Sequence, residues 1–510
     1  DNIYVIDTYL DKHWQHHSDL RDQKFKSQSL ETTWSLNYQF NENHTIGARY
    51  NFERTPKDKA YSNQFTQTYC NEQLYEGMHS MATTNEPETY HRSNFYYNGK
   101  IKEWSIDFNA DGFWMNTQSR QVAQEDITDG MSDSEDRNVT TKSTNSNELY
   151  ASKLVISYPF GKGDLSFGAE YSHIKRNTTY LNEEGIIDND LSMIKEGATS
   201  AFVEYSREFR NWNLQAGLRY EHVGFDYYNN GKYIAKQSKI YNHIFPSITF
   251  GFPIKDVQLQ IGYASDIVRP GYWQLSSNTT YANRYLYDKG NPFLMPSITH
   301  NVTLGASYEW MNLYVGYSHV KDAITTQTTA YSEDDPTIAM MTVLNAPEYD
   351  KLVASINFSP SIGCWTPQLG LSLQKQWYEG ETPQGKEKFN KPVGSITFRN
   401  NFKLPKGFLL DISGSWMTKG YLENIYLDDN PIDLSASLSK SFLKDNLTLQ
   451  LRADDILEPK QVATFYSGLR VMQDTYYFHR QITFTLRYKF NSTRSKYKGT
   501  GAGESQKNRM

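Results

Sequence analysis

Apolar and polar residues alternate one by one in many segments of this chain. In QITFTLRYKF, residues 481–490, Ile482, Phe484, Leu486, Tyr488 and Phe490 alternate with polar side chains. The same pattern recurs at 165–171, 214–221, 257–263 and 447–454. Side chains of a β-strand point alternately to its two faces, and helical spacing fits none of these segments. The pattern predicts two-faced strands, but a single strand does not tell which face is inside.

The lengths of the connections indicate which face is inside. Tight turns rich in Gly, Pro, Asn and Asp lie at 41–44, 99–103, 160–164, 252–256, 404–407 and 443–446. Long polar segments lie between them, at roughly 55–90, 116–147, 176–197, 268–297, 326–347 and 456–478. Outer-membrane barrels have short periplasmic turns and longer extracellular loops. We therefore expect the apolar face to contact lipid, with Leu447, Leu449, Leu451, Phe484 and Leu486 on it.

Composition agrees with a membrane barrel and argues against other classes. Only 38% of the residues are hydrophobic, but 15% are aromatic, with 38 Tyr and 10 Trp. A barrel needs only one apolar band on one face, with aromatic rings at both membrane interfaces. No apolar segment approaches the roughly 20 residues of a transmembrane helix. The net charge of −6 gives no indication of a nucleic-acid partner.

These features predict an all-β fold, a large transmembrane antiparallel β-barrel over residues 1–490. About 20 strands are visible if residues 1–10 form the first, and an even total of about 22 would need one more pair of strands ahead of residue 1. Residues 491–510 lack alternation and carry five basic residues and one acidic residue. We expect a flexible, basic periplasmic tail there. Its GTGAG segment is too close to the end for the helix that a phosphate-binding loop requires.

Three stretches resemble the C-terminal barrel of TonB-dependent outer-membrane receptors, in particular the outer-membrane β-barrel protein subfamily. VRPGYWQL at 268–275 resembles an Arg-Pro-x-Tyr-x-x-Leu motif that opens a long loop. GNPFLMPSITHNVTLGASYEW at 290–310 resembles the Gly-Asn-Pro-x-Leu-x-Pro motif that closes it. RYKFNSTRSKYKGTGAG at 487–503 resembles the subfamily's last strand and tail. The resemblance covers nearly the whole chain, but the family's plug domain and TonB-binding segment are not visible.

The resemblance implies a multi-pass protein of the outer membrane that takes up a siderophore, metal chelate, oligosaccharide or peptide. Its expected partners are outer-membrane lipid and lipopolysaccharide, its own N-terminal plug, TonB through an upstream segment, and a surface lipoprotein. No enzymatic activity and no cofactor are expected. The alternative is a barrel that does not transport and acts as an adhesin or assembly scaffold. An open porin fits poorly with so wide a barrel.

The long segment 268–297 carries the candidate ligand-binding residues. Rings and guanidinium groups suit a sugar, a peptide or an anionic chelate. The alternative is that the rings pack the loop on itself or form the upper interfacial girdle. The candidates are Arg269, Tyr272, Trp273, Tyr281, Arg284, Tyr285 and Tyr287.

Two other polar clusters have simpler interpretations. His13, His16 and His17 could converge on a metal, but histidines in a polar loop are usually solvated, and we predict no metal site. The acidic residues of 125–136 do not have EF-hand spacing. We expect a solvated acidic loop that interacts at most with divalent ions of the lipopolysaccharide layer. No catalytic arrangement of side chains stands out.

Overall fold

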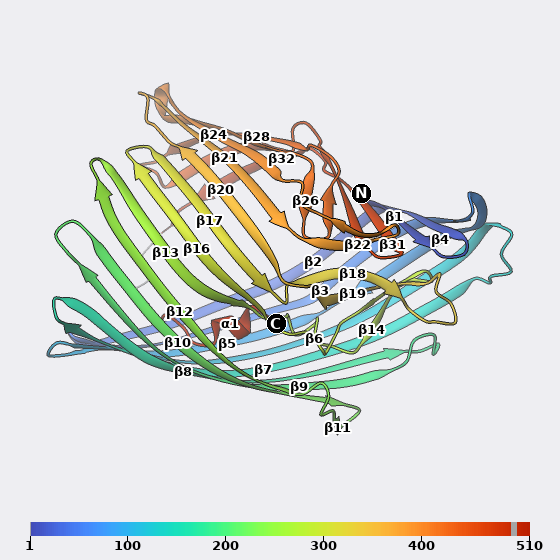
Figure 1. Ribbon diagram of the computed structural model, residues 1–510, viewed down its shortest axis with the longest axis horizontal. Coiled ribbons are helices and arrows are strands. Elements are labelled where there is room, and N and C mark those ends of the chain that lie inside the picture. Colours follow the sequence, from blue (N-terminus) through green and yellow to red (C-terminus); the bar gives the residue numbers. More distant parts are fainter. Residues whose placement is uncertain (1, 491–496) are drawn as a thin grey trace.

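Long antiparallel strands form one strongly curved sheet in the computed structural model, which describes residues 2–490 and 497–510 (Figure 1). The strands of the curved wall are, in chain order, β2 (His13–Asn41), β3 (His44–Cys70), β5 (Glu88–Ile101), β6 (Trp104–Gly130), β7 (Arg137–Phe160), β8 (Gly163–Asn182), β9 (Asp190–Glu208), β10 (Asn213–Asn229), β12 (Lys239–Ile254), β13 (Val257–Val268), β16 (Ser297–Tyr308), β17 (Met311–Lys321), β20 (Tyr349–Phe358), β21 (Trp365–Trp377), β24 (Val393–Leu404), β25 (Phe408–Met417), β28 (Ile432–Phe442), β29 (Leu447–Asp454) and β32 (Gln481–Tyr488).

Each wall strand pairs with the next in antiparallel register. All six tight turns predicted from the sequence join neighbouring wall strands at one end of the sheet, which confirms that part of the prediction. One of them contains the short 3-10 helix η1 (Pro405–Gly407). No helix among residues 2–490 and 497–510 has the length and apolar character needed to span a bilayer.

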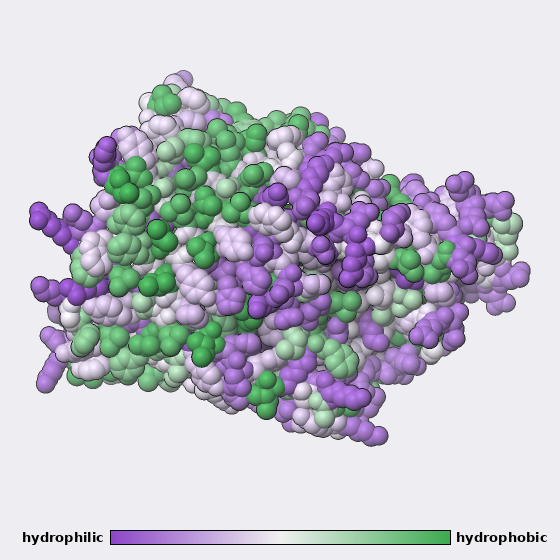
Figure 2. Space-filling model, in the orientation of Figure 1, coloured by the Kyte–Doolittle hydropathy of each residue, from purple (hydrophilic) through white to green (hydrophobic). Residues whose placement is uncertain are grey.

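The two faces of the wall differ as the alternation predicts. One row of register partners on the outer face is apolar and consists of Phe250, Ile261, Leu304 and Val315. The neighbouring row on the inner face is polar or small and consists of Thr249, Gly262, Thr303 and Gly316. Ile261 is 47% exposed, and many other outward apolar side chains are also exposed. Figure 2 shows hydrophobic residues, in green, gathered over the left part of the visible face and hydrophilic residues, in purple, over much of the right part.

The polar half is built mostly of strands, although its segments were expected to be loops. β2, β3, β6 and β7 each have 24 or more residues, well beyond the roughly 9–11 that cross a membrane. β4 (Gln73–Asn85) fills the space between the upper parts of β3 and β6. Polar segments can pair in this way because their outer face meets water instead of lipid and many buried positions on the inner face are polar, so no apolar alternation marks them.

Short strands continue the sheet around its upper end. β1 (Asn2–Tyr9) pairs with β2 on one side and with β31 (Arg470–Tyr477) on the other. β31 pairs with β30 (Lys460–Ser467), β30 with β27 (Ile425–Leu427), and β27 with β26 (Gly420–Leu422). Lower down, β2 below Leu20 pairs only with β3, and β32 pairs only with β29 within the described chain. These two edges share no ladder in the described chain.

The last described residues, 497–510, pack against the inner face, although a flexible tail was expected from the sequence of 491–510. Residues 491–496 of that expected tail lie outside the described residues. Residues 497–510 contact β6, β8 and β9 and end in the one-turn helix α1 (Glu504–Lys507) inside the curve of the sheet (Figure 1). Basic side chains and backbone N–H groups of the tail bind carboxylates on the wall. The tail sequence alone does not reveal these partners.

Candidate functional site

Two loops form a small sheet at the upper end of the wall, which we call the lid. β14 (Thr279–Asn283) and β15 (Leu286–Lys289) come from the segment predicted to bind ligand, and β18 (Ile324–Ala330) and β19 (Ala339–Asn345) from the next long loop. β15 and β19 pair in parallel and join the two hairpins into four strands. The lid therefore depends on both loops folding together.

The lid is attached to several parts of the wall. Tyr281 and Tyr287 pack against a buried cluster that includes Val139 and Tyr180 of β7 and β8. On another side, Leu286 packs with Ile6 of β1. The β18 backbone accepts a hydrogen bond from the Asn424 side chain at the Thr326 carbonyl, and its Thr328 N–H donates one to the Ser467 hydroxyl, near β27 and β30. These contacts place the lid across the upper opening of the curved sheet.

Arg284 connects the lid to two buried carboxylates of the long hairpins. Its Nε lies 3.2 Å from Glu125 Oε2, and its Nη1 lies 3.5 Å from Glu76 Oε1. Glu125 also accepts a hydrogen bond from the Tyr281 hydroxyl at 2.6 Å and pairs with Arg137. Burial of paired charges fixes geometry because a charge left without its partner is costly. Glu125 is fully buried, so the prediction of a solvated acidic loop is wrong at this position, whereas its neighbour Asp126 is exposed.

Tyr285 continues this cluster toward β1 and β2. Its hydroxyl donates to Glu76 at 2.6 Å, and its ring stacks on His16 with centroids 4.4 Å apart. Burial raises the pKa of Tyr285, and the Glu76 carboxylate raises it further. Burial alone would raise the pKa of Glu76, but hydrogen bonds from Ser132, Ser134 and Tyr285 and the charge of Arg284 hold it below its ordinary value.

His16 does not share a metal site with the neighbouring histidines. It is buried, and its two ring nitrogens lie near Thr68 Oγ1 and the Thr337 carbonyl, while His13 pairs with Asp7. Desolvation lowers the pKa of His16 to about 4, so it is neutral at pH 7. Across the described residues, His, Cys, Asp and Glu side chains do not gather in groups of three or more suited to a metal ion.

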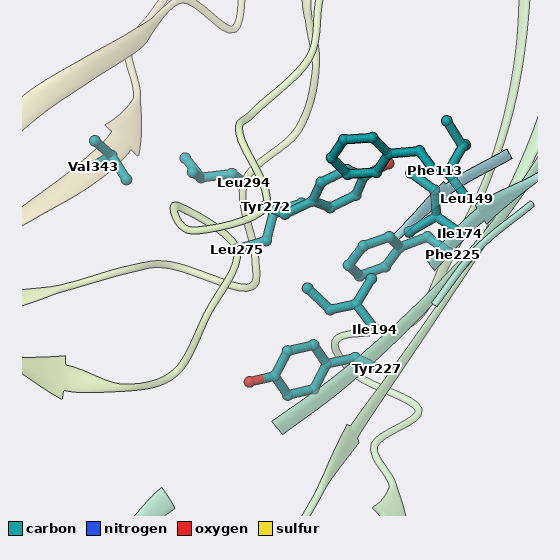
Figure 3. Close-up of a cluster of buried hydrophobic side chains, with 10 residues drawn as sticks. All are labelled: Phe113, Leu149, Ile174, Ile194, Phe225, Tyr227, Tyr272, Leu275, Leu294 and Val343. Atoms are coloured by element: carbon teal, nitrogen blue, oxygen red, sulfur yellow. The ribbon is translucent and has the colours of Figure 1, made fainter. Parts of the chain in front are cut away.

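Arg269 and Tyr272 belong to a second cluster, deeper inside the curve. Figure 3 shows the Tyr272 ring lying among Phe113, Leu149, Ile174 and Phe225 of the wall. The Tyr272 hydroxyl donates to Glu196 at 3.1 Å, and Arg269 forms an ion pair with Glu221. Six of the seven predicted ligand residues thus make internal contacts in two clusters, and Trp273, 61% exposed, lies outside both.

A polar hollow of about 680 Å³ lies beside the lid, within the size range of small-ligand sites. Its walls are β18, the β22 (Glu379–Thr382) and β23 (Gly385–Lys388) hairpin and the end of β30. Hydroxyl and amide groups of Thr325, Gln327 and Asn424 line it together with the charged groups of Glu381 and Lys386. The residues of this hollow come from four separate loops without a shared motif, so no sequence signal predicts it.

Comparisons with known proteins agree on a class of fold. The outer membrane protein beta-barrel family matches residues 97–488. A search of curated proteins finds no significant match. Among solved structures, the siderophore receptor PirA from Pseudomonas aeruginosa is 12% identical, with 94% of this chain and 80% of that chain covered and a TM-score of 0.51. The outer membrane transporter YddB from Escherichia coli is 11% identical, with 94% and 80% covered and a TM-score of 0.53. The siderophore receptor PiuA from Acinetobacter baumannii is 10% identical, with 93% and 81% covered and a TM-score of 0.53.

Proposed function

The chain belongs to the outer membrane protein β-barrel family, and we propose that it forms the wall of a TonB-dependent receptor that imports a ligand across the outer membrane. The resemblance to TonB-dependent receptors seen in the sequence is confirmed, as is the outer-membrane location. The proposed ligand is a siderophore, another metal chelate, an oligosaccharide or a peptide.

The lid is the observation that carries this proposal. An open porin needs an unobstructed passage, whereas here a four-stranded sheet lies across the upper opening and is tied down by buried charges. A closed mouth suits a receptor that binds a specific ligand and opens under an applied force. An adhesin or assembly scaffold also tolerates a closed mouth, so the test must detect the coupling to TonB.

Ligand contact is proposed for the exposed surface around the lid. Trp273 offers a free ring, and the 680 Å³ hollow offers hydroxyl, amide and charged groups of both signs. The other candidates, Arg269, Tyr272, Tyr281, Arg284, Tyr285 and Tyr287, would act mainly by holding the loops in the shape that presents these groups. Such a division fits binding sites in general, where rigid surroundings position a few exposed contacts.

The barrel itself is proposed to close with the help of further strands. The lower edges of β2 and β32 offer unpaired backbone groups, which a membrane-spanning sheet cannot leave exposed to lipid. Three strands between them, the lower continuation of β1 and one further pair, would bring the 19 wall strands to a barrel of about 22, a size that requires a plug in its lumen. TonB would then act on that plug, and lipopolysaccharide and a surface lipoprotein would contact the outside.

Crosslinking to TonB tests the proposal without knowledge of the ligand. Cells would produce the complete protein that contains this chain, and formaldehyde adducts would be detected with antibodies to TonB. We expect an adduct of the size of receptor plus TonB. Absence of this adduct, in cells where an established TonB-dependent receptor yields one, would overturn the proposal and favour the scaffold.

A further inference from the structure

The GTGAG segment of the tail meets the inner face as a strip of backbone donors. The N–H of Gly501 donates to Asn109 Oδ1 at 3.1 Å, and that of Gly503 donates to Glu170 Oε1 at 2.8 Å. Between them, the N–H of Ala502 donates to Asp111 Oδ1 at 3.2 Å. Two of these three acceptors are carboxylates, to which backbone N–H groups form strong hydrogen bonds, and the three consecutive hydrogen bonds fix the register of the segment.

Glycine is required at alternate positions of this strip. Gly501 and Gly503 have φ of +82° and +67°, a region that side chains disfavour. A Cβ at Gly499 would lie 2.5 Å from Asn94 Oδ1, and one at Gly503 would lie 2.7 Å from the Ala151 Cβ. The glycine spacing is therefore explained by close approach to β5 and β7, so a phosphate-binding role is not needed to account for it.

Two basic side chains beyond the strip complete the contact. Lys507 forms an ion pair with Asp111, whose side chain is 5% exposed. Arg509 forms two hydrogen bonds to Glu196, at 2.6 and 3.0 Å, and both side chains are at least nine-tenths buried. This bidentate geometry is the strongest and most specific form of carboxylate recognition by arginine.

The same Arg509 holds the start of the loop that leads to the lid. Its Nε donates to the Pro270 carbonyl at 2.9 Å, and its own carbonyl accepts a hydrogen bond from the Tyr272 N–H at 3.0 Å. Its guanidinium lies over the Tyr272 ring, 4.1 Å from the centroid. Arg269 donates to the Ser505 hydroxyl at 3.0 Å. The tail thus lies between the wall and the segment 269–272.

We propose that the inner face carries a binding site for a glycine-rich basic peptide, filled in cis by residues 497–510, and that Arg509 thereby fastens the loop 269–276 inside the barrel. The carboxylates of Asp111, Glu170 and Glu196 form the site. The tail acts as an internal clamp on the loop that supplies β14 and β15 of the lid.

Hydrogen exchange on the complete protein in detergent tests the proposal, with the amides of 501–503 as the readout. In the wild type, we expect these amides to exchange at least about 100-fold more slowly than in a free peptide. Arg509→Glu should abolish this protection and also speed exchange at 271–275. The double variant Glu196→Arg with Arg509→Glu should restore it, and Lys498→Glu, at an exposed position of the same tail, should change nothing.

Fast exchange at 501–503 in the wild type would overturn the proposal, because it would mean that a plug or solvent occupies the site. The proposal would also be overturned if Arg509→Glu and Lys498→Glu lost protection to the same extent, because the change of charge alone would then explain the effect. If Glu196→Arg prevents folding, Lys507→Ala offers a second variant that leaves the wall intact, and it should raise exchange at 501–503 at least tenfold. An unchanged rate in Lys507→Ala would count against the clamp.

Discussion

Arg284 lies with its Nε 3.2 Å from Glu125 Oε2, although 159 residues separate the two along the chain. This contact joins the lid to the tip of the β6–β7 hairpin and places a guanidinium between two buried carboxylates. It fixes the lid against the upper part of the wall.

Removal of the Arg284 side chain should loosen the lid. Arg284→Ala leaves Glu76 with hydroxyl donors only, whereas Glu125 keeps Arg137. Loss of one partner of a buried ion pair typically costs about 3–5 kcal/mol, and the remaining partners place this case at the lower end. Amides of β14, β15 and β19 should exchange at least tenfold faster. Lys142→Ala, which removes a half-exposed pair with Glu183, serves as the control and should leave these rates unchanged.

Acid should weaken the same region through His16. Its pKa in the folded protein is about 4, below the ordinary 6.5, because burial disfavours the charged ring. Between these two pH values the His16 ring takes up a proton in the unfolded state but not in the folded state, so stability falls as the pH drops from 6.5 to 4. The total loss of folding free energy is about 3 kcal/mol. Lid exchange, corrected for its intrinsic pH dependence, should rise over this window in the wild type and lose most of that rise in His16→Gln.

A charge on the outer face should destabilise the barrel much more than one on the inner face. Ile261 is half exposed in the middle of the apolar band, and a lysine near the bilayer midplane costs about 2–4 kcal/mol. Gln260, its neighbour on the opposite face, lies across from Gly251 and Gly305, so Gln260→Lys has room and water. Urea unfolding in lipid vesicles measures both variants. Equal losses would contradict the orientation of the wall.

The topology can be read on intact cells. An epitope inserted at 128–134, in the upper turn between β6 and β7, should bind antibody without permeabilisation. An epitope at 443–446, in the tight turn between β28 and β29, should bind only after the outer membrane is opened. Labelling of the second site alone on intact cells would reverse the assignment of the two ends.

Alternation and turn spacing were sufficient to predict the wall, because both arise from local geometry and from the lipid on one side. The upper hairpins were expected as loops because strands whose outer face meets water instead of lipid carry no regular apolar period. Arg284 was found through its residue type, but its partners Glu76 and Glu125 were not, since pairing across more than 150 residues leaves no local signal. The role of the tail was missed for the same reason: Arg509 needs Glu196, which lies 313 residues away.

Ligand accumulation that depends on TonB tests the central claim most directly. Cells with and without TonB would produce the complete protein and receive ferric desferrioxamine B, haem, cobalamin or maltohexaose, each radiolabelled. The proposed function predicts that at least one probe accumulates above the level of cells lacking the receptor, and only when TonB is present. The proposed function would be contradicted if all four probes accumulated only to the background level in both strains, while the receptor was folded at the surface and gave no TonB adduct.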